Sequence, residues 1–264
     1  MSRVRTVLGH LLRALLGLVV ETAQLVVPLH CPCGKEGTVL CGRCRRELGA
    51  RPVRVDAGCS ALQLVDAADP RRGEVDFLPM FPVLAIGEHR GRLRRIVLAW
   101  KNGGMHILTG AIADALAPGV DQLTPATGGS GGDTVLVPVP SRTESRVRRG
   151  EDHTGALARA IAARTGVRSC RVLSLRGQGQ AGKGRRARRA RGGAVRLRRR
   201  LDHGTRAVLI DDVATTGATL RACADALTSS GVEVIGALVI AGAPEPSGAA
   251  QMPPSAMRDR ALAS

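Results

Sequence analysis

One stretch toward the C-terminal end of the chain, RAVLIDDVATTGATLRACADAL, restricts the possible fold more than any other. It reads as an apolar strand, two adjacent carboxylates (Asp211 and Asp212), a turn of small residues and then a helix. In open α/β sheets, ligands bind beyond the carboxyl ends of the parallel strands, where these two acids would lie. The stretch therefore predicts an α/β domain with a binding site at that edge of its sheet.

The turn after the two acids suits an anion. Its backbone N–H groups and three hydroxyls precede a helix, whose dipole also favours negative charge at that end. The residues are Ala214, Thr215, Thr216, Gly217, Ala218 and Thr219. Phosphate fits this turn and sugar hydroxyls fit the carboxylates, so a ribose 5-phosphate fits both. The lysine of a Walker loop and the glycines of a dinucleotide fingerprint are missing.

Continuous apolar segments that alternate with helical patterns predict a parallel sheet covered by helices on both faces. Strands are expected at 83–89, 134–140, 171–175, 206–211 and 233–242. Helices are expected within 89–104 and at 107–117, 153–166 and 216–231, the first with its apolar face at Leu93, Ile96, Val97 and Trp100. Thr154 and Gly166 are the expected start and stop of the third helix, and residues 118–133 are expected to form a surface loop.

The chain divides into three predicted regions. Residues 1–74 hold an amphipathic helix and a cysteine-rich knuckle followed by a polar, loop-like stretch, residues 75–243 form the α/β domain, and residues 244–264 form a disordered tail. The leading apolar run is short and interrupted by His10 and Arg13, so neither a membrane span nor a signal peptide is expected. A cytoplasmic location follows as an expectation.

The knuckle HCPCGKEGTVLCGRC has the composition of a structural zinc site. Cys41 and Cys44 form a regular half-site, because two thiolates separated by two residues can bind one tetrahedral ion. The first half is irregular: either His30 with Cys33, or Cys31 with Cys33, would complete four ligands. The alternative is a knuckle that has lost its metal. The other cysteines, Cys59, Cys170 and Cys223, are interpreted as ordinary buried residues.

The charge of the chain points to an anionic partner. The formal net charge is +17, and arginines are concentrated at residues 182–200. Such a charge is typical of proteins that bind nucleic acid, membrane surfaces or phosphorylated small molecules. Phe77, Phe81 and Trp100 are the only aromatic residues, so binding by stacked bases is poorly supported.

The segment VLIDDVATTGAT resembles the phosphoribosyl-pyrophosphate (PRPP) binding motif of type I phosphoribosyltransferases. Residues 25–242 are similar to one branch, the ComF family of competence-associated phosphoribosyltransferase-like proteins. The shared features are the knuckle, the lysine of LAWKNGG, the segment VPVPSRTESRVRRGEDHTGALA and the loop QAGKGRRARRARGG. The family usually has R-G-F-N-Q where this chain has R-G-E-D-H, and the first half of the knuckle is one residue short.

This resemblance implies a type I phosphoribosyltransferase fold and displacement of pyrophosphate from C1 of PRPP, with magnesium. Asp211 and Asp212 would then hold the ribose hydroxyls, directly or through the metal, and residues 214–219 would hold the 5-phosphate. The implied pyrophosphate ligands are Lys101, Ser141, Arg142 and Arg149. Residues 176–193 would form a basic lid. His153 is interpreted as an exposed neighbour of a helix cap, without a role in proton transfer.

Two functions remain open at this point, with a plain structural role as a third alternative. The first is an enzyme that transfers phosphoribosyl to an unidentified acceptor. The second is a non-catalytic module of the ComF type that binds PRPP or nucleic acid during DNA uptake, with single-stranded DNA held by the arginine-rich 182–200 segment. The intact acidic motif favours the first, and the arginine cluster favours the second.

Overall fold

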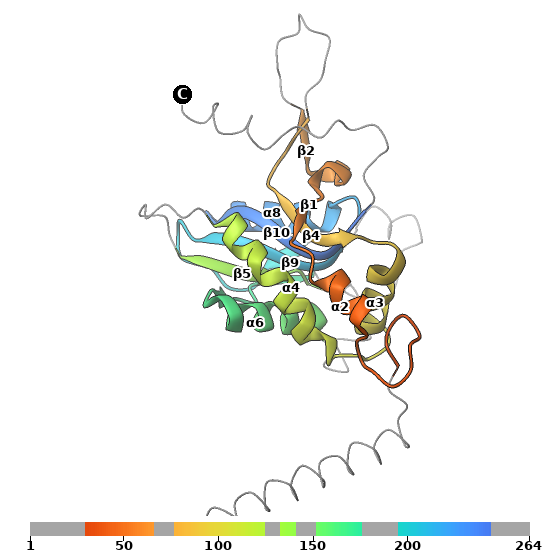
Figure 1. Ribbon diagram of the computed structural model, residues 1–264. Helices are drawn as coiled ribbons and strands as arrows, with labels where there is room; N and C mark the ends of the chain where they lie inside the picture. The colour runs from red at the N-terminus through yellow and green to blue at the C-terminus, as the bar shows by residue number, and fades with distance from the viewer. Residues whose placement is uncertain (1–29, 66–76, 125–132, 141–151, 176–194, 244–264) are drawn as a thin grey trace, which may run out of the picture.

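The computed structural model of the protein (Figure 1) describes residues 30–65, 77–124, 133–140, 152–175 and 195–243. A six-stranded sheet with the order β1-β4-β10-β9-β5-β6 lies at its centre. The strands are β1 (Val53–Arg54), β4 (Val83–Glu88), β10 (Glu233–Gly242), β9 (Arg206–Ala214), β5 (Thr134–Pro138) and β6 (Arg168–Ser169). β1 runs antiparallel to β4, and all the other neighbours are parallel. The predicted α/β class with a mostly parallel sheet is confirmed.

Helices cover both faces of this sheet (Figure 1). One face packs against α2 (Gly42–Leu48), α3 (Gly91–Lys101), α4 (Leu108–Leu123) and α6 (His153–Thr165). The other face packs against α8 (Ala218–Thr228) and two short 3-10 turns, η1 (Asp56–Gly58) and η2 (Ser60–Leu62). The apolar face predicted for α3 is confirmed, because Leu93, Ile96, Val97 and Trp100 are all buried.

The central strands are apolar on both sides, as a sheet between two helical layers requires. In β9, Val208 and Ile210 belong to the core under α2, α3, α4 and α6, whereas Ala207 and Leu209 belong to the core under α8. This alternation follows from the two-residue period of a strand. The order changes at the end of the strand, where Val213 packs against the first of these cores and Ala214 belongs to the second.

The predicted surface loop from residue 118 is wrong in its first part. α4 continues through Pro118 to Leu123, so the helix is longer than the pattern predicted. Val120 and Leu123 are buried against the sheet, and Gly119 lies close to Leu238 of β10. Burial of these residues outweighs the unfavourable effect of a proline inside the helix.

Two other local predictions differ from the structure. The cap of α6 is Asp152, whose carboxylate accepts a hydrogen bond from the backbone N–H of Gly155, whereas the predicted cap Thr154 donates its hydroxyl to the carbonyl of Val139. Gly166 ends the helix in the left-handed conformation, as predicted. β7 (Leu173–Leu175) pairs with β8 (Val195–Leu197) in a separate hairpin, and Arg168–Ser169 joins the main sheet instead.

The stretch between the knuckle and residue 65 is more ordered than its polar sequence predicted. It contains α2, β1, both 3-10 turns and β2 (Gln63–Val65), which pairs with β3 (Phe77–Pro79). The predicted leading helix, the basic lid and the C-terminal tail lie outside the described residues. Among the described helices, none has the length and hydropathy that crossing a membrane requires.

Candidate functional site

Asp211 and Asp212 lie near the C-terminal end of β9, which is an inner strand between β10 and β5. The strand period directs the two side chains to opposite faces of the sheet. Asp211 is paired with Val239, a residue of the core under α8, and its charge acts on the thiol of Cys223 in that helix. Asp212 lies on the other side, where its carboxylate forms an ion pair with Lys101 of α3.

The two carboxylates have different electrostatic environments. Burial, and then the neighbouring charge of Asp212, raises the pKa of Asp211 to about 8. Asp212 is 8% exposed and has a cation beside it. Each carboxylate also accepts a 2.8 Å hydrogen bond from the next backbone N–H group, that of Asp212 for Asp211 and that of Val213 for Asp212. The two adjacent carboxylates therefore differ: burial favours the protonated form of Asp211, whereas Asp212 has the ammonium group of Lys101 beside it.

The turn after the acids has the form that an anion site needs. Gly217 is the N-cap of α8, with a φ of 75°, and as a glycine it has no side chain to cap the helix. The hydroxyl of Thr216 accepts a long, 3.4 Å hydrogen bond from the first N–H group, that of Ala218. Thr215 and Thr216 are exposed, and Thr219 is half-buried. Unsatisfied N–H groups at a helix N-terminus, together with nearby hydroxyls, suit a phosphate. Gly217 and Ala214, in the same turn, are buried.

A segment without any sequence motif supports this turn. The backbone N–H of Ala61 donates to the carbonyl of Thr216 at 2.8 Å, and Arg221 of α8 donates to the carbonyl of Ala61. A side chain at Gly217 would lie 2.9 Å from Cγ of Leu62 and 3.0 Å from Cβ of Cys59. The close packing of η2 against the turn therefore requires a glycine there.

His89 is a further residue at this edge that the sequence analysis missed. It follows β4 directly, and its backbone N–H donates to the carbonyl of Gly242 at the end of β10. Its buried Nε2 atom has no hydrogen-bond partner among the described residues. Burial is the main cause that lowers the pKa of His89, and Arg94 adds to the effect. The sequence signal that could have identified His89 is its position at the end of a predicted strand of a parallel sheet.

The expectation that His153 is exposed is wrong. The imidazole is half-buried and stacks on His106, with the ring centroids 5.0 Å apart and the planes at 18°. It also lies 5.3 Å from the ring of Trp100, the residue before Lys101. His153 is therefore packed against the end of α3 rather than directed into solvent.

Lys101 is the one described residue among the four predicted to bind pyrophosphate. Ser141, Arg142 and Arg149 lie outside the described residues. The strand before them ends beside the acids, because the backbone N–H of Val139 donates to the carbonyl of Ile210 at 2.9 Å. Lys101 is at the same edge, but its ammonium group contacts Asp212.

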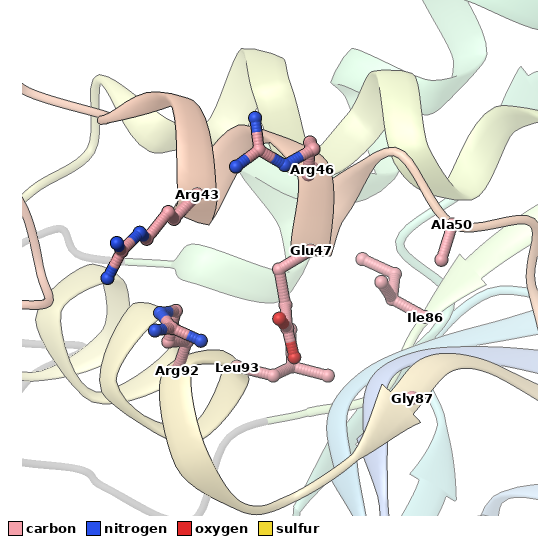
Figure 2. A pocket seen from close by; sticks show the side chains of 8 residues that line it. All are labelled: Arg43, Arg46, Glu47, Ala50, Ile86, Gly87, Arg92 and Leu93. Carbon is pink, nitrogen blue, oxygen red and sulfur yellow. The ribbon is translucent and has the colours of Figure 1, made fainter.

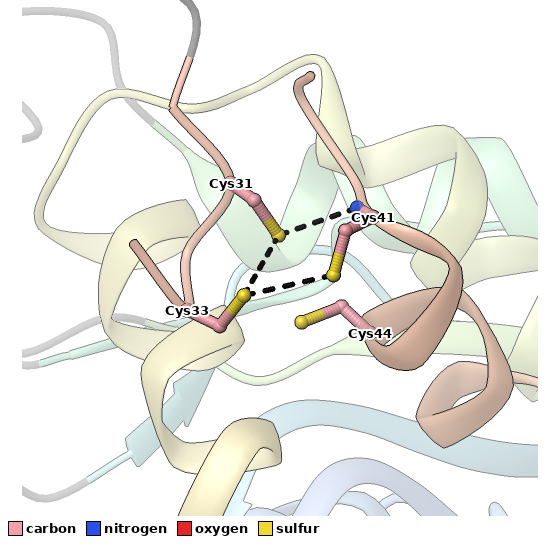
Figure 3. A group of neighbouring side chains, drawn as sticks. All are labelled: Cys31, Cys33, Cys41 and Cys44. Carbon is pink, nitrogen blue, oxygen red and sulfur yellow. Dashed lines mark hydrogen bonds between the residues drawn. The ribbon is translucent and has the colours of Figure 1, made fainter. Parts of the chain in front are cut away.

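The four cysteines of the knuckle converge (Figure 3). The sulfur atoms of Cys31, Cys33, Cys41 and Cys44 all lie within 4.8 Å of one another. Cys33 is 3.5 Å from Cys31 and 3.6 Å from Cys41. Four thiolates at a zinc–sulfur distance of 2.3 Å would be about 3.8 Å apart, so the group fits a tetrahedral zinc ion. His30 is exposed and is not part of the group.

Thiolate formation in the knuckle is favoured at one position in particular. The backbone N–H of Cys44 is the largest cause that lowers the pKa of Cys41 to about 6. Cys41 is the N-cap of α2, where backbone N–H groups stabilise a negative charge. Burial and the neighbouring thiols raise the pKa of Cys44. A cation would be needed to hold all four cysteines as thiolates.

Comparison with known proteins adds a family match over part of the chain. The family described as "Phosphoribosyl transferase domain" matches residues 177–260, a range that includes β9, the acidic pair and α8. No curated protein sequence matches the chain.

Several solved structures are similar to the chain. Adenine phosphoribosyltransferase from Thermoanaerobacter pseudethanolicus has 15% identity and a TM-score of 0.35, over 70% of this chain and 85% of that one. The enzyme from Saccharomyces cerevisiae has 12% identity and a TM-score of 0.35, over 70% and 86%. Orotate phosphoribosyltransferase from Aeropyrum pernix has 18% identity and a TM-score of 0.33, over 78% and 83%.

Proposed function

We propose that the protein is a phosphoribosyltransferase that binds PRPP with magnesium and transfers the phosphoribosyl group to an acceptor, releasing pyrophosphate. The observation that carries the proposal is the acidic pair followed by a hydroxyl-rich helix N-terminus whose N-cap is a glycine, within the range of the family match. Carboxylates suit ribose hydroxyls and the turn suits a phosphate. The arrangement therefore matches one end of PRPP.

The proposed reaction is a substitution at C1 of the ribose. A bond forms between C1 and a nucleophilic nitrogen of the acceptor, and the C1–oxygen bond to pyrophosphate breaks with its electron pair. The acceptor then loses a proton. Because pyrophosphate is a good leaving group, catalysis would depend on positioning and on stabilisation of charge.

Different residues of the chain would bind the 5-phosphate, the ribose and the pyrophosphate. Thr215, Thr216 and the N–H groups after Gly217 would hold the 5-phosphate, and Asp211 and Asp212 would orient the ribose hydroxyls. Lys101 would move from Asp212 toward the pyrophosphate, since a lysine is a flexible point charge. Magnesium, when bound, would neutralise pyrophosphate oxygens and keep most of its own waters.

The experiment is a titration of the protein with PRPP and magnesium, followed by an assay of pyrophosphate release with a panel of nucleobases and amines. Asp211→Asn and Asp212→Asn should each weaken PRPP binding about tenfold or more. Asp121→Asn is the matched control, since Asp121 is an exposed acid of α4. If PRPP does not bind, or binds Asp211→Asn as well as it binds the native chain, the proposal is wrong.

The family of the protein and its metal ion are also part of the proposal. The knuckle, Lys101 and the acidic motif are together similar to the ComF family, and we assign the protein to that group with a structural zinc ion on Cys31, Cys33, Cys41 and Cys44. A cytoplasmic location follows from the same assignment.

A second candidate function is a nucleic-acid-binding module in DNA uptake. The net charge of +17 and the arginines of residues 182–200 favour it. Binding to single-stranded DNA should then weaken steeply between low and moderate salt, because each neutralised phosphate releases counterions. An affinity that is independent of salt would exclude this role for the arginines.

A further inference from the structure

A groove of about 570 Å³ lies between α2, the start of α3 and the end of β4 (Figure 2). It shares no residue with the acidic pair or the turn after it. The groove lies near the N-terminal end of α3, whereas Lys101, the partner of Asp212, is the last residue of the same helix. Arg92 and Lys101 are thus separated by about 13 Å along the helix axis. The groove is a place distinct from the candidate active site.

Three arginines lie at the rim of the groove. Arg43 and Arg46 come from α2, and Arg92 comes from α3. All three are exposed, and none has an ion-pair or side-chain hydrogen-bond partner in the part of the chain that the structure describes. The guanidinium groups of Arg43 and Arg92 lie near each other, whereas that of Arg46 lies apart (Figure 2). Two neighbouring guanidinium groups repel one another and attract an anion. Their planar fork matches the oxygens of a phosphate.

The interior of the groove differs from its rim. Ile86 and Leu93 are 4% and 2% exposed and form an apolar floor, and Gly87 adds no side chain above it. The carboxylate of Glu47 points from α2 toward Leu93, with Arg43 and Arg92 on one side (Figure 2). Glu47 forms no ion pair within the described residues. An ionised carboxylate only accepts hydrogen bonds, so it calls for donors on a ligand.

These features restrict the ligand to one chemical class. It needs an anionic end for the arginines, a flat apolar body for the floor, and N–H or O–H donors for Glu47. Inorganic phosphate lacks the apolar body, and its charge would be repelled by Glu47. A volume of this size suits one small ligand. We propose that the groove binds a nucleoside monophosphate, with its phosphate between Arg43 and Arg92 and the donors of its base or sugar on Glu47.

The test is calorimetric titration of the full-length, zinc-loaded chain with each of the four common nucleoside 5-monophosphates. Arg43→Gln/Arg92→Gln should weaken binding at least tenfold, because each charge-assisted hydrogen bond contributes substantially. Arg45→Gln/Arg94→Gln is the matched control: it removes the same charge from exposed positions of the same two helices outside the groove. The control should change affinity less than twofold. An equal loss in both variants would show nonspecific attraction and overturn the proposal.

Glu47→Gln gives a second readout, whose sign distinguishes nucleotide from phosphate. It should weaken nucleotide binding, yet leave the affinity for inorganic phosphate unchanged or higher, since a repulsive charge is removed. If inorganic phosphate binds as tightly as the nucleotides, the floor and Glu47 contribute nothing and the proposal is wrong.

Two further outcomes would also overturn the proposal. One is binding of a single-stranded oligonucleotide without binding of any monophosphate, which would assign the groove to nucleic acid. The other is nucleotide binding that Asp211→Asn/Asp212→Asn abolishes and Arg43→Gln/Arg92→Gln preserves, which would place the nucleotide at the sheet edge. Nucleotide binding in the groove is expected even if the protein does not bind PRPP.

Discussion

The ammonium group of Lys101, at the end of α3, forms an ion pair with the carboxylate of Asp212, near the end of β9. The two residues are far apart in the sequence but close at the carboxyl edge of the sheet. The ion pair places a cation beside one of two adjacent acids, and burial raises the pKa of the other acid, Asp211, which favours its neutral form. Two adjacent carboxylates can therefore be accommodated in the ligand-free protein without two full negative charges.

Removal of the ion pair should destabilise the fold. In Lys101→Met, Asp212 would remain almost buried beside Asp211 without its cation, whereas Lys101 itself is 38% exposed at its side chain. The expected loss lies between that of an exposed and that of a buried pair, about 1 to 2 kcal/mol in the free energy of unfolding. Urea denaturation at pH 7 measures it.

The control for this prediction is a double-mutant cycle with Asp212→Asn. The double variant should lose less stability than the sum of the two single variants, because each substitution removes the same interaction. Strict additivity would show that the contact between Lys101 and Asp212 contributes no stability.

The raised pKa of Asp211 predicts how stability depends on pH. Its folded-state pKa of about 8 lies above the ordinary aspartate value of 3.8, so the folded state binds more protons between these two values. The contribution of Asp211 is therefore fully present below pH 4 and is lost as the pH rises through 8. Relative to the native chain, Asp211→Asn should become progressively more stable over that range. Denaturant unfolding at several pH values measures the difference, and a constant difference would contradict the prediction.

Gly217 should tolerate a side chain less well than another glycine with the same backbone conformation. Gly217 and Gly166 have φ angles of 75° and 73°, but only Gly217 has neighbours within 4 Å, namely Leu62 and Cys59. Gly166→Ala should cost about 1 to 2 kcal/mol through backbone strain alone. Gly217→Ala should cost about 1 kcal/mol more, because the methyl group displaces η2.

Ligand binding separates these two variants further. Gly217→Ala should also weaken PRPP binding, since the turn that receives the phosphate would move. Gly166→Ala should bind PRPP normally, because Gly166 ends α6 and is not part of that turn. Equal stability losses would show that η2 moves aside without cost.

The parts of the fold that the sequence predicted depend on local patterns. The alternation before Asp211, the four apolar positions of α3 and the small residues after Asp212 each determine their structure within a few neighbours. Local patterns do not specify which other element each helix or strand packs against. Nothing local to Ala61 indicates that its N–H donates to Thr216, and nothing local to Lys101 identifies Asp212 as its partner.

The errors have the same origin. Pro118 is a helix breaker by propensity, but Val120 and Leu123 reach the sheet only if the helix continues. His153 was interpreted as exposed because a helix start usually is, and the approach of His106 and Trp100 is a tertiary contact. Tertiary burial thus decided the cases in which local propensity failed.

The cysteine cluster predicts which residues bind zinc, and the two ligand sets proposed from the sequence give opposite results. Because Cys31 belongs to the group of four sulfur atoms and His30 does not, Cys31→Ser should lose zinc and His30→Ala should keep it. Metal analysis of the purified proteins measures this directly. A chelator should also lower the thermal unfolding temperature of the native chain and of His30→Ala, because Cys44 and Leu48 connect the knuckle to the main core. Native protein purified without chelators that contains no zinc would show that the knuckle has lost its metal.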